Sequence, residues 1–170
     1  MTAMIGYMNL DEQVDRDFGL ARRRSMVARL AARLRGDPGR GKLPAFEPVR
    51  RATRAENRMY LGPRTVEVSR IVGSVGRSGE FDRGFMPTTR AGAERWKRVD
   101  GAFHGGVDLP PVTLYEICGG YFVEDGNHRV SVARFHGVEM MDAEVTRFYP
   151  LSPACACDPA TLGRDLAVAP

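Results

Sequence analysis

The sequence predicts an α+β fold, in which a small mixed β-sheet with packed helices follows an N-terminal helical extension. Short aromatic and β-branched segments between positions 65 and 148 have the composition and alternation of strands. Segments with the 3.6-residue periodicity of amphipathic helices lie between them. Glycine and proline at residues 36–41 separate this region from a long helical segment. We therefore expect a basic helical extension over residues 1–62, the α+β domain over 63–150, and an irregular tail over 151–170.

The extension begins with a helix signal. Asn9 is a favoured N-cap, and Glu12 stands at the third helical position. Beyond Gly19 the apolar stripe changes direction, so we expect either two helices or one helix bent near Gly19. A further short helix is predicted within residues 47–60. Three basic residues share the side opposite the second apolar stripe: Arg22, Arg29 and Arg33.

The basic residues are concentrated in this extension. Residues 1–60 hold 13 Lys and Arg against 7 Asp and Glu, whereas residues 61–170 hold 12 against 14. Such an excess is typical of surfaces that bind nucleic acid or another polyanion. The side with the three arginines is therefore the candidate DNA surface. Two alternatives stay open: a solvated helix face, and a coding bias toward arginine, which supplies 23 of the 25 basic residues.

Alternation and glycine content predict the first elements of the domain. Residues 65–69 alternate with period two, as the first strand should. Residues 71–77 contain two glycines, and we expect an irregular turn there. Residues 93–103 carry aromatic and aliphatic side chains at helical spacing, which predicts a helix covering the sheet. His104 follows as a helix-end residue, where a cation is favoured by the helix dipole.

The second half of the domain is predicted to be a hairpin, a helix and a last strand. Residues 112–117 and 121–124 read as two strands joined by a tight turn at Cys118-Gly119-Gly120. Residues 127–136 have helical periodicity, and Gly137 follows as a C-terminal stop. The last strand lies within residues 138–148.

The junction between the hairpin and this helix carries the candidate chemistry. Its residues are Asp125, Gly126, Asn127, His128 and Arg129. The first N–H groups of a helix have no intrahelical acceptor and lie at the positive end of its dipole, which favours an anion. Gly126 lets the backbone approach a ligand, and His128 and Arg129 add donors for phosphate. An Asp or Asn N-cap beside a surface histidine and arginine is the alternative.

The run from Asp125 to Val130, followed by Ala133, resembles the phosphate-binding signature of the ParB/sulfiredoxin-like fold. The corresponding motifs are Gly-Cys-His-Arg in sulfiredoxins, Gly-Glu-Arg-Arg in ParB partition proteins and Asp-Gly-His-His-Arg in ADP-dependent free-serine kinases. In these families the motif begins a helix and holds nucleotide phosphates. The resemblance covers residues 64–148. It implies a phosphate site made of five residues: Gly126, Asn127, His128, Arg129 and Arg77.

The resemblance also bears on the chemistry. Asn127 stands where sulfiredoxins have their nucleophilic cysteine, so sulfinic-acid reduction is excluded. Asp125 matches the first residue of the kinase signature and is a candidate catalytic base or metal ligand, with Glu80 or Glu67 as the second carboxylate. The nucleotide would be CTP, ADP or ATP, with or without Mg²⁺.

Three function classes follow, and whether the protein is an enzyme stays open. The leading one is a ParB-like protein that binds a nucleotide or phosphate and is regulatory or DNA-associated, with DNA held by the N-terminal helices. The second is a small-molecule phosphotransferase or nucleotidase. The third is a structural protein without a ligand. A homodimer is compatible with each.

No apolar run reaches the ~18 residues that a membrane span needs. The N-terminus lacks a charged-then-apolar signal pattern, so we expect a cytoplasmic protein without a membrane partner. The three cysteines, Cys118, Cys155 and Cys157, lack the spacing of a disulfide framework. Cys155 and Cys157 also have no second ligand pair nearby, and no metal site is predicted.

Overall fold

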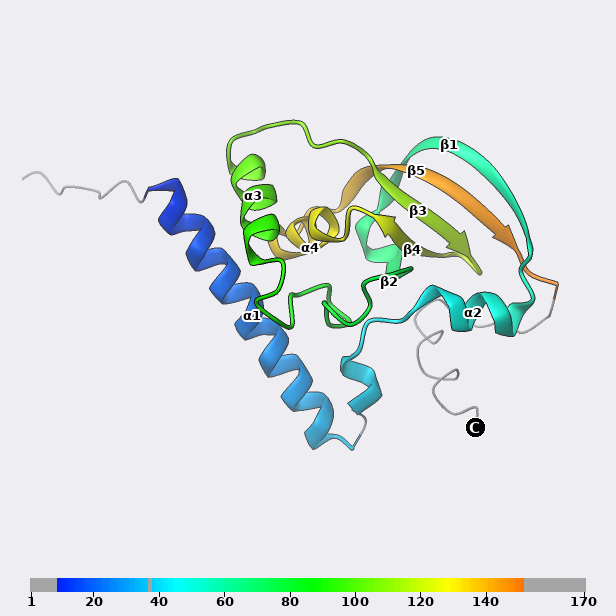
Figure 1. Ribbon diagram of the computed structural model, residues 1–170, viewed down its shortest axis with the longest axis horizontal. Helices are drawn as coiled ribbons and strands as arrows, with labels where there is room; N and C mark the ends of the chain where they lie inside the picture. The colour runs from blue at the N-terminus through cyan, green and yellow to red at the C-terminus, as the bar shows by residue number, and fades with distance from the viewer. Residues whose placement is uncertain (1–8, 37, 152–170) are drawn as a thin grey trace, which may run out of the picture.

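The computed structural model describes residues 9–36 and 38–151 and confirms an α+β fold with an N-terminal helix. Within these residues the chain forms one mixed sheet, four α-helices and two short 3-10 helices, at Pro38–Gly41 and Val68–Arg70 (Figure 1). The helices are α1 (Leu10–Leu34), α2 (Phe46–Thr53), α3 (Ala93–His104) and α4 (Asn127–His136). The strands are β1 (Asn57–Glu67), β2 (Ile71–Ser74), β3 (Val112–Ile117), β4 (Gly120–Asp125) and β5 (Met140–Tyr149).

The sheet has the order β1-β5-β3-β4-β2. The predicted hairpin is confirmed, since β3 and β4 pair antiparallel. Its two turn residues, Cys118 and Gly119, have φ values of 52° and 78°, as a tight type I′ connection requires. β1 pairs antiparallel with β5, whereas the β3–β5 and β2–β4 pairs are parallel. The two parallel pairs follow from crossover connections, which contain α3 between β2 and β4 and α4 between β3 and β5.

Helices cover both faces of this sheet. Tyr121 and Val123 of β4 belong to one apolar cluster together with Val130 of α4. Phe122, between them in the sequence, points into a second cluster with Phe46 of α2. β4 is therefore apolar on both faces, as a strand buried between two layers should be. A third cluster joins α1 and α3 to the outer side of α4, and Figure 1 shows these three helices gathered at one end of the molecule.

Trp96 ties α3 to α4. It is fully buried, and its indole Nε1–H donates to Ser131 Oγ of α4 at 2.8 Å. Phe18 of α1 packs on the same indole, with ring centroids 5.5 Å apart. The predicted helix over residues 93–103 is thus confirmed, and its aromatic stripe is core.

α1 is a single helix that runs through Gly19, one of the two expected alternatives, and Val27, Leu30 and Leu34 of its second apolar stripe are exposed. Two expectations differ from the structure. β1 begins at Asn57, before the expected domain boundary at 63, because its first half pairs with the end of β5. Ile71–Ser74, expected within an irregular turn, is strand β2 against β4.

Two further observations concern the cysteines and the C-terminal residues. Cys118 is disulfide-bonded, which the spacing of the cysteines did not predict. Cys155, Cys157 and nearly all of the expected irregular tail lie outside the described residues. The last described residue, Leu151, donates its N–H to Thr53 O of α2 at 3.0 Å.

Gly73 of β2 supplies a test of this packing. A Cβ there would lie 2.4 Å from Phe122 Cε1 and 2.5 Å from Pro44 O, so Gly73→Ala overpacks the interior. We expect the free energy of unfolding to fall by about 1–3 kcal/mol in urea denaturation. Gly19→Ala is the control, because nothing lies within 4 Å of its Cβ position. It should raise stability by up to about 1 kcal/mol through helix propensity. A Gly73→Ala protein as stable as the parent would contradict the described contact of β2 with β4.

Candidate anion-binding site

The predicted strand-to-helix junction is confirmed, since β4 ends at Asp125 and α4 begins at Asn127. Gly126 between them has φ 100°, in the left-handed region that favours glycine. A Cβ at this position would also lie 2.6 Å from Val112 Cγ1 of β3. Backbone conformation and close packing therefore both require glycine here, and the turn takes one residue.

The first backbone amides of α4 have no acceptor among the described residues. The first helical hydrogen bond runs from Val130 N to Gly126 O at 3.0 Å. The N–H groups of Asn127, His128 and Arg129 precede it and make no hydrogen bond within the described part of the chain. These three donors, at the positive end of the helix dipole, are the groups that hold anions at helix N-termini.

Asn127 and His128 lie inside the molecule. Their residues are 4% and 7% exposed, whereas the alternative interpretation of the junction had a surface histidine. Asn127 Oδ1 and both ring nitrogens of His128 are shielded from solvent and have no hydrogen-bond partner among the described residues. The ring of Phe81 packs on the imidazole, with centroids 5.3 Å apart. Unpaired buried polar atoms are costly, so such a cluster needs a functional explanation.

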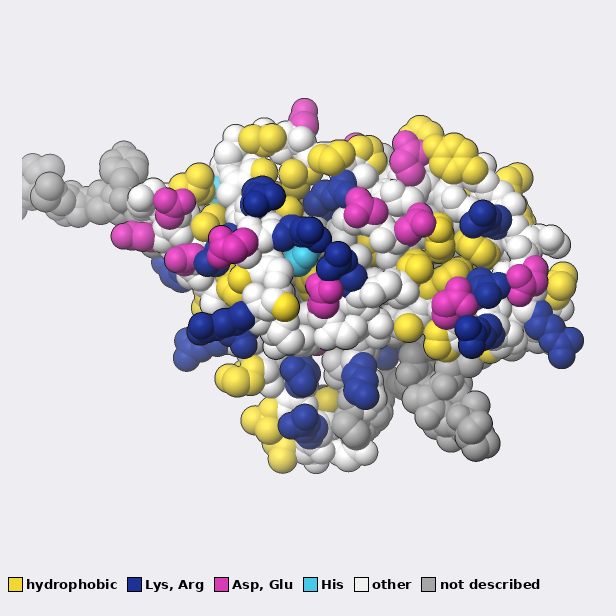
Figure 2. Space-filling model, viewed as in Figure 1, with side chains coloured by type: hydrophobic (Ala, Val, Ile, Leu, Met, Phe, Trp, Pro, Cys, Tyr) yellow, Lys and Arg dark blue, Asp and Glu magenta, His cyan; other side chains and the backbone are white. Residues whose placement is uncertain are grey.

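Charged side chains surround this histidine. Burial, together with the smaller effects of the positive charges on Arg95 and Arg77, lowers the pKa of His128 from its usual 6.5 to about 4. Glu80 acts in the opposite direction. Two cations therefore lie near His128, whose own backbone amide is one of the three unpaired amides of α4. Figure 2 shows basic side chains around a histidine where Figure 1 has α4.

Arg77 and Glu80 form an ion pair beside His128. Arg77 Nη1 donates to Glu80 Oε1 at 2.8 Å, and both side chains are partly exposed. The Cβ position of Gly92 lies 3.0 Å from His128 Cε1 and 4.0 Å from Glu80 Oε2. Gly92 therefore lies against the imidazole, and Glu80 of the ion pair lies close to both.

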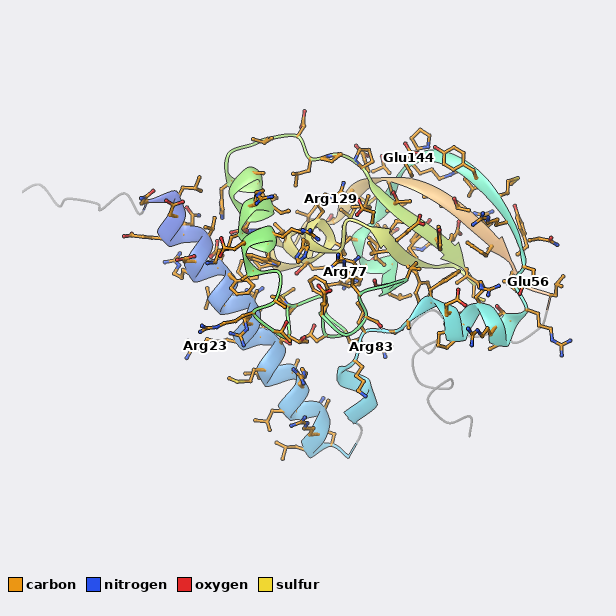
Figure 3. The ribbon with its side chains drawn as sticks, in the orientation of Figure 1. Arg23, Glu56, Arg77, Arg83, Arg129 and Glu144 are labelled. Atoms are coloured by element: carbon orange, nitrogen blue, oxygen red, sulfur yellow. The ribbon has the colours of Figure 1, made fainter. Side chains whose placement is uncertain are left out.

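Arg129 faces a different set of partners. Its guanidinium donates to Pro110 O and to Pro111 O, the latter at 2.8 Å, and to Asp125 Oδ2 at 2.6 Å. It holds the segment leading into β3 against the junction, and its side chain is only 14% exposed. Asp125 is exposed and paired with this arginine. Figure 3 shows Arg77 and Arg129 on either side of the start of α4.

The predicted residues thus fall into two groups. The structure brings Asn127, His128, Arg77 and Glu80 together, while Asp125 and Arg129 form a separate pair on the outer side of the helix. Sequence reasoning missed Arg95 and Gly92, which reach the site from α3 and the segment before it. No short motif marks them, because they are more than 30 positions from His128 in sequence.

The three arginines expected on one side of α1 do share a side. Arg22, Arg29 and Arg33 line a groove of about 1040 Å³ between α1 and residues 88–97. Arg23 and Arg90, which the prediction did not include, line it as well. Figure 2 shows this basic group extending along α1. Lys97, Asp15 and Glu94 complete its charged lining, so its charge is mainly basic.

Comparisons of the chain with family models, with curated proteins and with solved structures find no match. None of the described helices is long and apolar enough to cross a lipid bilayer.

The buried imidazole predicts a pH dependence. Because the pKa of His128 is about 4 when folded and near 6.5 when unfolded, the unfolded chain binds more protons between these values. Stability should therefore be complete above about pH 6.5 and fall as the pH drops toward about 4. His128 contributes a loss of at most about 3 kcal/mol across this window. Urea unfolding at several pH values measures the loss.

His128→Gln is the comparison, since it cannot titrate. Subtracting its curve from that of the parent cancels the carboxylates and the other two histidines. A difference that stays flat from pH 4 to 7 would show that His128 ionises as easily in the folded protein as in the unfolded chain.

Proposed function

We propose that the N-terminal end of α4 binds the phosphate group of a nucleotide. The observation that carries this is the buried His128 ring, without a hydrogen-bond partner among the described residues, at the place where two arginines and three unpaired amides meet. A phosphate requires hydrogen-bond donors and positive charge that the protein's own acceptors do not already use. A site of this kind is stabilised by its ligand.

The described residues enclose the imidazole. Solvent reaches neither ring nitrogen, and Gly92 and Phe81 both lie against the ring. We therefore expect the amides of α4 and Arg77 to make the first contacts with phosphate. Arg77 must then exchange Glu80 for the ligand, which its partial exposure allows. If residues 88–92 then move, the ring of His128 can also contact the phosphate.

Two arguments support a nucleotide over a bare anion. Asn127 Oδ1 is a buried acceptor without a donor among the described residues, which a fully ionised phosphate cannot satisfy but a hydroxyl or amino group can. The motif likeness to ParB/sulfiredoxin-like proteins favours CTP, ADP or ATP. A phosphotransferase remains the second candidate, with Glu80 rather than Asp125 as its carboxylate, because Glu80 lies beside His128.

The basic groove along α1 supports a DNA-associated role. It lies next to the proposed phosphate site, since Ala93 at its edge follows Gly92, which covers His128. Phosphate contacts by arginine supply affinity without reading sequence. We propose that duplex DNA binds there, with the nucleotide site acting as its regulator.

Nucleotide binding is tested by thermal shift with ATP, ADP, CTP and GTP, each with and without Mg²⁺, beside inorganic phosphate. At a hundred times the dissociation constant, a ligand adds about 2.7 kcal/mol of stability. Arg77→Ala should lower affinity about ten- to a hundredfold, since a charge-assisted hydrogen bond is worth about 1.5–3 kcal/mol. Arg64→Ala, on the edge strand β1, is the matched control and should bind as the parent does.

Arg129→Ala adds a contrast, because its guanidinium already serves three protein acceptors. We expect it to lower the melting temperature more than Arg77→Ala does. Phosphorus NMR of the same samples shows whether the nucleotide is converted, which would favour the phosphotransferase. If no nucleotide or phosphate raises the melting temperature, or if Arg64→Ala weakens binding as much as Arg77→Ala, the proposed site is wrong.

DNA binding is tested by the salt dependence of affinity for duplex DNA. Each phosphate contact that a variant removes should reduce the slope of log K against log salt by about 0.9, so charge reversal at Arg22, Arg29 and Arg33 should remove about 2.7. The control reverses three exposed arginines elsewhere, Arg54, Arg58 and Arg64, with the same change in net charge. The groove is excluded as the DNA surface if the parent protein does not bind duplex DNA at low salt. It is also excluded if both triple variants lose the same amount of affinity for DNA.

A further inference from the structure

A second polar cluster lies at the opposite end of α4, where this helix meets α1 and α3. It consists of Asp17 from α1, Asp100 and His104 one turn apart on α3, and His136 at the end of α4. His128 and His136 are eight residues apart, which is about 12 Å along a helix. The cluster is therefore separate from the proposed phosphate site.

The four side chains converge on one point. One ligand atom from each, a carboxylate oxygen or an imidazole nitrogen, lies within 4.8 Å of all the others. His136 Nε2 is 2.7 Å from Asp100 Oδ1, and His104 Nε2 is 3.0 Å from Asp17 Oδ2 and 3.7 Å from Asp100 Oδ2. Four ligands 2.0–2.2 Å from a tetrahedral metal lie about 3.3–3.6 Å from each other. Two of the observed separations, 2.7 and 3.0 Å, are shorter than this spacing, and the third, 3.7 Å, is slightly longer.

Hydrogen bonds join His104 to Asp17 and His136 to Asp100, but among the described residues they leave one oxygen of the cluster without a partner. The side chain of Asp100 is fully buried, and its Oδ2 has no hydrogen-bond partner among the described residues although it faces His104. A buried carboxylate oxygen without a donor is strongly unfavourable. Two carboxylates and two imidazoles are also a set of metal ligands that suits a divalent cation.

We propose that Asp17, Asp100, His104 and His136 bind a divalent transition metal, with Zn²⁺ as the best fit. Two nitrogen and two oxygen ligands in a small, nearly closed space suit tetrahedral zinc, whereas Mg²⁺ and Ca²⁺ take six or more oxygen ligands. The four side chains are between 0% and 21% exposed. No position remains open for a substrate within the described residues, so the ion is structural and fastens α1 to α3 and α4.

The sequence signal for this site is weak. Asp100 and His104 have the i, i+4 spacing that places two ligands on one helix face. Asp17 and His136 join them only through the packing of three helices, so His104 was interpreted as a helix-end residue. Nothing in this inference depends on the phosphate site.

The test uses the full chain without an affinity tag, with its disulfide intact and its remaining free thiol alkylated under non-reducing conditions so that no thiol competes for the metal. Titration with Co²⁺ should produce the visible absorption of a tetrahedral ion at one equivalent, and Zn²⁺ should displace it. Asp100→Asn and His104→Gln should each weaken binding at least a hundredfold. Glu12→Gln, an exposed carboxylate in the first turn of α1, is the control and should bind as the parent does.

Folding of the variants is followed by circular dichroism, and His104→Gln keeps the test valid if Asp100→Asn fails to fold. Zn²⁺ should raise the melting temperature of the parent and not that of His104→Gln, while Mg²⁺ should raise neither. The proposal is overturned if the alkylated chain binds less than one equivalent, if the cobalt complex lacks tetrahedral absorption, or if His104→Gln binds with unchanged affinity.

Discussion

Gly126 lets β4 pass into α4 without a loop, because its φ of 100° turns the chain within one residue and its missing side chain leaves room for Val112. The direction of α4 follows from this turn. One side of the helix then packs Val130 on the sheet, and the other packs Val132 against α1 and α3. With both sides buried, the polar residues of its first turn have no way to reach solvent fully. Asn127 and His128 are therefore interior groups, and their unsatisfied atoms are a consequence of the turn that glycine permits.

The predictable part of the fold is the part in which one local pattern decides the structure. The β3–β4 hairpin, α3 and α4 combine a clear periodicity with glycine stops, and all three form as predicted. β2 was missed because it packs on both faces, so its sequence does not alternate, and because Gly73 looks like a turn residue when it in fact admits Phe122. The first half of β1 is exposed and polar, and only its pairing with β5 makes it a strand. The apolar stripe beyond Gly19 in α1 is largely exposed, because the domain covers only one part of that helix.

The candidate site also has one part that a local sequence pattern predicts and another that only tertiary packing determines. A contiguous motif marks the residues of one turn, and those positions were found from sequence. Which of them faces the interior depends on the packing of α4, so His128 and Arg129 have different surroundings although they are neighbours. Arg129 combines with Asp125 and two proline carbonyls to hold the approach to β3. Arg95 and Gly92 come from another part of the chain, and only the docking of α3 against α4 brings them to the imidazole. The same docking assembles the Asp17, Asp100, His104 and His136 cluster.

α1 connects the two proposals. The helix is held to the domain by the Phe18 contact with Trp96, by the Asp15–Lys97 ion pair of 2.7 Å, and by Asp17 in the four-residue cluster. Arg22 lies five residues beyond Asp17, about 7.5 Å along the same helix, and lines the basic groove. A metal ion that fixes Asp17 to α3 would therefore also fix the distance between the arginines of α1 and the segment at residues 88–97. That segment ends the groove on one side and covers His128 on the other. A phosphate that displaces it would widen the same groove, so ligand binding at α4 and polyanion binding along α1 would be coupled through one short segment, with α1 as the rigid wall.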